Sequence, residues 1–150
     1  MLRFHTPHSP ATEEQVRLIE ERIGKRLPDD YREFLLTVNG GYRPDPGIFD
    51  VPGEGTSEWH GVLGFAGRGS YDLRRHLHPE SEYLPHCLPI GHDICGNNLL
   101  LGLHESHFGR IYWEDHELTQ HGEQRPPIRL ADSFTEFLRA LRLRNESKRA

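Results

Sequence analysis

The chain has 150 residues, which suits one domain with a single hydrophobic core. Hydrophobic residues make up 35% and charged residues 27% of it, and the 15 glycines and 11 prolines are spread along its length, so the composition is that of a loop-rich globular domain and not of a disordered chain. The net charge of -5 is uneven, because residues 27–124 carry 6 basic and 16 acidic residues. This acidic middle repels nucleic-acid phosphates and favours a basic protein partner, although a negative surface can also simply keep a protein dispersed.

Two helices are predicted near the N-terminus. Thr12 and Gln15 have the spacing of a capping box, and the apolar positions that follow share one face, which predicts a helix over residues 12–24. Pro28 then begins a second helix in "LPDDYREFLLTVNGG" (27–41), with two aspartates where the helix dipole favours acidic groups. The pair Asn39-Gly40 predicts the end of this helix.

The middle of the chain is predicted to form short strands separated by glycine and proline. Short apolar runs around residues 48–49 and 59–65 indicate two strands. Ser70 is expected to begin a short helix that Pro79 ends. Beyond Pro85, the segments "HCLPI", "NNLLLGLH" and "GRIYWED" predict three antiparallel strands, and "IRLA" (128–131) predicts one more.

A C-terminal helix completes the predicted fold. Ser133 and Glu136 form a second S-x-x-E capping box ahead of an apolar helix face. The order of helices, strands and a helix predicts an α+β fold. We expect a single domain over residues 1–150, with a core at about 12–143 and flexible ends, built on an antiparallel or mixed sheet of about five to six strands flanked by two N-terminal helices and one C-terminal helix.

The N-terminus and the cysteines indicate the compartment. The first fifteen residues have no apolar signal region, and no stretch approaches the roughly 18 apolar residues of a membrane helix. Cys87 and Cys95 are too few for a disulfide scaffold and lack the C-x-x-C spacing. The sequence therefore predicts a soluble, cytoplasmic protein with free thiols and no membrane partner.

Histidines and cysteines raise the possibility of a metal site. His86, Cys87, His92 and Cys95 can all ligate zinc, but neighbours on a strand point to opposite faces, so one tetrahedron does not easily collect both His86 and Cys87. A metal-dependent hydrolase that uses some of the 11 histidines is therefore only a third-ranked hypothesis. We expect no metal, no cofactor and no catalytic residue, since neither a P-loop nor a nucleophile elbow is present.

Four blocks of this sequence resemble the SUKH superfamily, which includes yeast cell-wall assembly regulators and bacterial toxin-immunity proteins. They are "IGKRLPDDYREFLLTVNGG" (23–41), "LPIGHDICGNNLLLGL" (88–103), "GRIYWEDHE" (109–117) and "LADSFTEFLRAL" (130–141). The blocks follow the order and rough spacing of the family. Cys95 departs from it, because it stands at a turn position where the family often has glycine.

The resemblance implies a non-enzymatic protein-binding domain. Its leading form is an immunity protein that neutralises a bacterial toxin such as a nuclease, and its alternative is a regulatory or scaffold domain that binds an endogenous protein. Since a nuclease needs a cationic surface for its substrate, we expect carboxylates of the acidic middle to contact it, with aromatic side chains as anchors. The expected carboxylates are Asp45, Asp50, Glu54, Glu58, Glu114, Asp115 and Glu117. The expected anchors are Tyr42, Trp59 and Trp113, although half-buried sheet positions are the more ordinary place for the two tryptophans.

Overall fold

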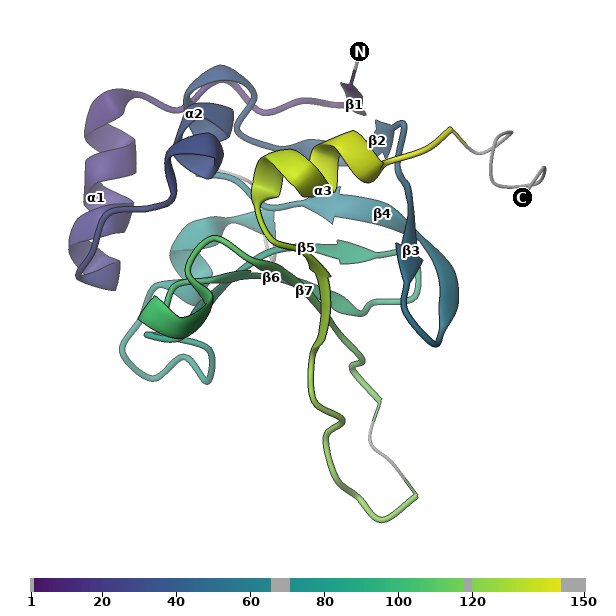
Figure 1. Cartoon of the computed structure of the whole chain (residues 1–150). Helices are drawn as coiled ribbons and strands as arrows, with labels where there is room; N and C mark the ends of the chain where they lie inside the picture. Colours follow the sequence, from purple (N-terminus) through teal and green to yellow (C-terminus); the bar gives the residue numbers. More distant parts are fainter. Residues whose placement is uncertain (1, 66–70, 118–119, 144–150) are drawn as a thin grey trace.

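The computed structural model describes residues 2–65, 71–117 and 120–143 of the chain. Three α-helices lie on one side of a single antiparallel sheet (Figure 1), and two short 3-10 helices lie in its connections. The helices are α1 (Glu13–Ile23), α2 (Asp29–Thr37), η2 (Leu73–His76), η3 (Glu105–His107) and α3 (Phe134–Ala140). The strands are β1 (Arg3–His5), β2 (Gly41–Asp45), β3 (Ile48–Val51), β4 (Gly55–Val62), β5 (Cys87–Asp93), β6 (Asn98–Gly102), β7 (Ile111–Glu114) and β8 (Ile128–Ala131).

The sheet confirms the predicted α+β class. Its strands follow the order β1-β2-β4-β5-β6-β7-β8. The remaining strand, β3, pairs with the first half of β4. It has eight strands where five to six were expected. The sequence analysis missed β1 and β2, because "GYRPD" contains glycine and proline, and the pairing of β1 with β2 joins segments far apart in the chain.

The predicted helix ends are confirmed in detail. Thr12 and Gln15 form both bonds of the capping box, at 3.1 and 3.0 Å, and Gly24 ends α1 in the left-handed conformation with a φ of 86°. Asn39 has a φ of 74° just after α2. Its buried side chain donates to the carbonyls of Ser9 and Phe65 and accepts from the Phe65 N–H, so the end of α2 also fixes two loops.

The helix expected after Ser70 is shorter than predicted. The chain forms only the 3-10 turn η2, whose N-cap is Asp72, with Oδ1 accepting from the Arg74 N–H at 3.0 Å. Asp72 therefore takes the capping role that the sequence analysis gave to Ser70, which lies outside the described residues. Arg74 also pairs with the Asp72 carboxylate, at 2.8 Å, and this local ion pair favours the tight turn.

The core lies between the helices and one face of the sheet, which we call the inner face. Trp59 of β4 is fully buried there, with its ring 5.4 Å from Phe137 and 6.5 Å from Phe134 of α3. Phe134 in turn contacts Phe34 of α2 at 5.0 Å. Edge-to-face pairs of this kind add to the apolar burial and dock α2 and α3 on the same part of the sheet.

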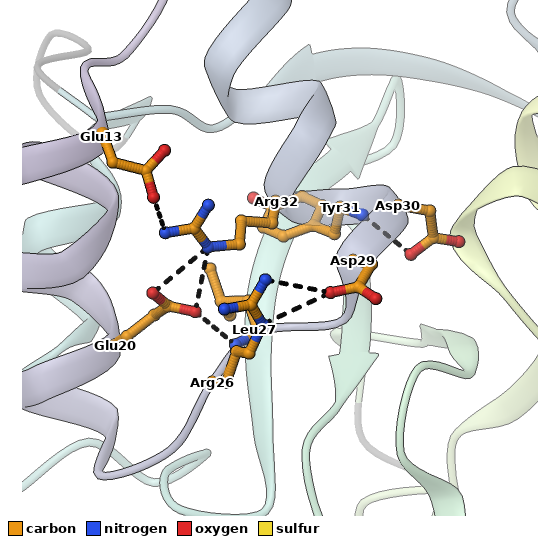
Figure 2. A network of polar contacts seen from close by, with 8 residues as sticks. All are labelled: Glu13, Glu20, Arg26, Leu27, Asp29, Asp30, Tyr31 and Arg32. Atoms are coloured by element: carbon orange, nitrogen blue, oxygen red, sulfur yellow. Dashed lines mark hydrogen bonds and ion pairs between the residues drawn. The ribbon is translucent and has the colours of Figure 1, made fainter.

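A polar network joins α1 to α2 (Figure 2). Arg32 of α2 is 9% exposed and bonds through Nε to both oxygens of Glu20, at 3.3 and 3.4 Å, while its Nη2 pairs with Glu13. Glu20 also accepts the Leu27 N–H at 2.8 Å, where the chain links the two helices. Both carboxylates come from α1, so this one guanidinium sets the position of α1 against α2.

We expect the Arg32→Met substitution to destabilise the fold, because it leaves the largely buried Glu20 carboxylate without its cation. Arg26→Met is the matched control, since the Arg26–Asp29 pair is 68% and 90% exposed and such pairs contribute little. Urea unfolding followed by circular dichroism should give a clearly lower midpoint for Arg32→Met alone. Equal midpoints for the two variants would contradict the structural role of Arg32.

Candidate protein-binding surface

Three hairpin connections meet at one end of the sheet. The strands β4, β6 and β8 begin at the end where β3, β5 and β7 finish, so the three connections gather there. We call this region the loop end and define it as residues 50–58, 93–98, 114–117 and 120–127. It contains eight acidic residues and a single arginine, Arg125. The loop end is thus the place where the fold concentrates the acidic middle of the chain.

The buried carboxylate of Asp93 organises the loop end. The residue is 1% exposed. Its Oδ1 accepts from the backbone N–H groups of Cys95 and Asn97, at 3.0 and 2.8 Å. Its Oδ2 accepts from Ser57 Oγ, Trp113 Nε1 and Asn97 Nδ2, at 2.7, 2.8 and 3.1 Å. These five bonds tie β4, the β5–β6 turn and β7 to one group.

The protonation of Asp93 follows from this arrangement. Burial by itself would raise the pKa of Asp93, but the hydrogen bonds from Trp113, Ser57 and Asn97 outweigh burial and hold the pKa below its ordinary value. The group therefore stays ionised at neutral pH. Asn97 extends the network, because its Oδ1 accepts from the His116 N–H at 3.0 Å and lies 2.7 Å from His116 Nδ1.

Arg125 connects two of the three hairpin connections at the loop end. Its Nη1 lies 2.7 Å from Glu54 in the β3–β4 turn, and its Nη2 pairs with Asp115 after β7. The hydrogen bond from the Glu117 N–H, and after it the one from Arg125, lower the pKa of Asp115. The β7–β8 loop is therefore fastened to the β3–β4 hairpin by one side chain.

Most of the carboxylates expected at a partner surface lie at the loop end. Glu54 and Asp115 share Arg125, and Glu117 is exposed beside them, with its N–H donating to Asp115 at 2.9 Å. Asp50 is exposed on β3 and pairs with Arg142 at 2.6 Å. Glu114 accepts from the Tyr83 hydroxyl at 3.1 Å.

Of the remaining expected residues, Glu58 lies at the border of the loop end, and the other four lie outside it. Asp45 and Glu58 line a groove of about 260 Å³ beside β3. Tyr42 is half-buried on the sheet face that the α-helices leave open, which we call the outer face. Trp59 and Trp113 are 0% and 6% exposed, so both serve the core, and the Trp113 indole is one of the donors to Asp93.

Sequence reasoning missed Asp93 and Ile94, although both belong to the block "LPIGHDICGNN". An aspartate with glycine three positions on and asparagine four positions on is the available signal for a turn that wraps around a carboxylate. Ile94 is 57% exposed at the tip of this turn, and its N–H donates to the Glu58 carbonyl at 3.0 Å. The apolar side chain of Ile94 is thus exposed to solvent at the acidic loop end.

In the described part of the chain, the histidines and cysteines are not arranged as metal ligands. Among the residues that the structure describes, no three His, Cys, Asp or Glu side chains are arranged to hold a metal ion. Burial, with a smaller contribution from Glu114, raises the pKa of Cys87 to about 11, so this thiol is a poor nucleophile at neutral pH. Cys95 is exposed in the β5–β6 turn.

Comparison with known proteins identifies the family. The family model of the SMI1 / KNR4 family (SUKH-1) matches residues 10–140. The chain therefore belongs to the SMI1/KNR4 (SUKH-1) family, which confirms the resemblance found in the four sequence blocks. No α-helix in the described part of the chain is long and apolar enough to cross a membrane.

One relative is a prophage protein. The chain is similar to the SPbeta prophage-derived uncharacterized protein YokK of Bacillus subtilis (strain 168), with 28% identity over 148 residues. The match covers 87% of this chain and 74% of that protein. The match therefore spans most of this chain.

We expect Asp93→Asn to lower the free energy of unfolding by about 3 kcal/mol, because an amide can accept on one side only and leaves two buried donors unpaired. Asp29→Asn is the control, since that side chain is 90% exposed. Urea denaturation of both variants measures the difference. A loss below about 0.5 kcal/mol for Asp93→Asn would contradict the organising role of the carboxylate.

The pH dependence of stability offers a second measurement. Because the pKa of Asp93 is lower in the folded than in the unfolded protein, its stabilisation is complete above about pH 4 and is lost as the pH falls through the folded pKa. The stability difference between wild type and Asp93→Asn should therefore shrink between about pH 4 and pH 2. A constant difference over this range would exclude the lowered pKa.

Proposed function

We propose that this protein is a non-enzymatic immunity protein that binds and neutralises a basic bacterial toxin through its loop end. The observation that carries the proposal is the collection of eight acidic residues against one arginine at this single end of the sheet. Membership in the SUKH-1 family supports a protein-binding role, and a prophage-derived relative is in keeping with a bacterial setting. Nuclease toxins, whose substrate contacts require cationic surfaces, are the partner class that this charge fits best.

Preorganisation supports binding by this surface. The Asp93 network fixes the β5–β6 turn, and Arg125 holds Asp115 against the β3–β4 hairpin, so these described residues lose little conformational freedom on association. The carboxylates accelerate the encounter with a cationic partner, and the exposed Ile94 supplies an apolar contact that slows dissociation. Ile94 takes the anchoring role that the two buried tryptophans do not fill.

The alternative is a regulatory domain that binds an endogenous protein, as the yeast members of the family suggest. Affinity capture from the lysate of the native host, at low and at high salt, separates the two proposals. A basic toxin that is retained at low salt and released at high salt supports immunity. An endogenous regulatory or cell-wall protein supports the alternative.

We expect charge reversal at the loop end to weaken binding of the captured partner. Glu54→Lys with Glu117→Lys should raise Kd by at least about tenfold at low salt, mainly through slower association. Glu14→Lys with Glu21→Lys on exposed positions of α1 is the control, because it changes the net charge by the same amount. Surface plasmon resonance measures both rates. Equal loss of affinity in the two double variants, or no loss in either, would refute binding through the loop end.

A further inference from the structure

The outer face carries a continuous row of aromatic and polar side chains. Directly opposed residues of an antiparallel sheet share a face, and the register pairs Tyr42 with Gly61, Gly61 with His92, His92 with Asn98, and Asn98 with Glu114. The row crosses five strands, from β2 to β7. All three α-helices lie on the opposite side of the sheet (Figure 1).

Four rings cluster at the β2 end of this row. Tyr42 lies 4.4 Å from Tyr71 and 6.4 Å from His60, and His92 lies 5.0 Å from Tyr71 and 5.8 Å from His60, as ring-centroid distances. Each of the four side chains is partly exposed. We call these residues the aromatic cluster.

Because Gly61 has no side chain, rings of the aromatic cluster pack directly against its backbone. A Cβ atom at this position would lie 2.3 Å from His92 Cε1 and 2.4 Å from Tyr71 Cε1. The two rings therefore approach the backbone of β4 closely and are held there by the sheet. A fixed, partly exposed group of rings presents π-surfaces to solvent at little further entropic cost on binding.

At the other end of the row stands a carboxylate. Glu114 Oε1 accepts from the Tyr83 hydroxyl at 3.1 Å and from Asn98 Nδ2 at 3.3 Å, and the Tyr83 hydroxyl also accepts from Asn98 at 3.0 Å. These bonds orient the carboxylate on the outer face. Glu114 also belongs to the loop end, so the row is continuous with the surface that we propose for the partner.

The cluster is suited to a cation. Burial lowers the pKa of His92, and His60 lowers it further against the opposing effect of Asp93, so the His92 ring is neutral at pH 7. Neutral imidazole and phenol rings stack favourably with guanidinium groups. The same chemistry occurs nearby within the chain, where the Arg74 guanidinium lies over the Phe65 ring at 5.1 Å.

We propose that the outer face recognises arginine side chains of the basic partner, which stack on the aromatic cluster and pair with Glu114. This inference rests on the proposed function for the nature of the partner and adds the chemistry of recognition. It predicts selectivity for arginine over lysine, because the planar guanidinium stacks on rings while the ammonium group is a compact, strongly hydrated charge. Binding by the loop-end carboxylates alone would not require a preference for arginine over lysine.

The test is an NMR titration of the full chain with tetra-arginine and, separately, with tetra-lysine. The aromatic signals of Tyr42, Tyr71 and His92 should shift with tetra-arginine at a concentration at least about threefold lower than with tetra-lysine. The signals of the buried Tyr31 serve as the internal reference. Tyr42→Leu should abolish the preference for arginine, whereas Phe108→Leu, at an exposed ring outside the row, should keep it.

The possible results separate this inference from the proposed function. Equal effects of the two peptides, with shifts confined to the loop end, would overturn arginine recognition and leave the acidic surface as the binding site. The absence of shifts in the aromatic cluster with either peptide would also overturn it, while the proposed function is judged independently by capture of the toxin. Arginine selectivity that persists in Tyr42→Leu would show that another surface is responsible.

Discussion

The arrangement of the loops depends on one buried anion, the Asp93 carboxylate, which pairs with no lysine or arginine of the described residues. The Asp93 carboxylate is stabilised by two backbone N–H groups and by three side-chain donors from separate parts of the chain. Hydrogen bonds to a charged group are stronger than neutral ones, and each of these donors would be costly to leave unpaired. The charge therefore specifies the relative position of β4, the β5–β6 turn and β7 at a point where the hydrophobic core alone would not.

The predictions that held are those whose cause is local. The capping box at Thr12, the serine cap at Ser133 and the apolar faces of the helices are each determined within a few residues, although the Glu136 carboxylate accepts from the Asp132 N–H and so does not complete the second box. Strands β5 to β8 were also found, because each is an apolar run bounded by turn residues. By contrast, β1 is a strand because it pairs with β2, and β2 because it also pairs with β4. Such pairing between distant segments cannot be predicted from a short stretch of sequence.

The candidate site was predictable in composition but not in geometry. The acidic excess of residues 27–124 is visible in the sequence, and the fold concentrates it at the loop end. The roles of Arg125 and Asp93 were missed, since their partners lie 71 and 36 residues away, at Glu54 and Ser57. For the two tryptophans, half-buried sheet positions were the more ordinary expectation and surface anchors the alternative, and the large apolar area of Trp59 and Trp113 is buried in the core.

The contact between Arg125 and Asp115 also joins two positions near the ends of the β7–β8 loop. It closes the chain from 115 to 125 into a ring, and Gln124 strengthens the closure by donating to the Asp115 carbonyl. A change of sequence or length inside such a ring is not transmitted to the strands on either side, whereas a change at the two closing residues is. Because loops tolerate changes of sequence better than the elements that they connect, we expect the residues between Asp115 and Arg125 to accept substitutions that leave the sheet unchanged.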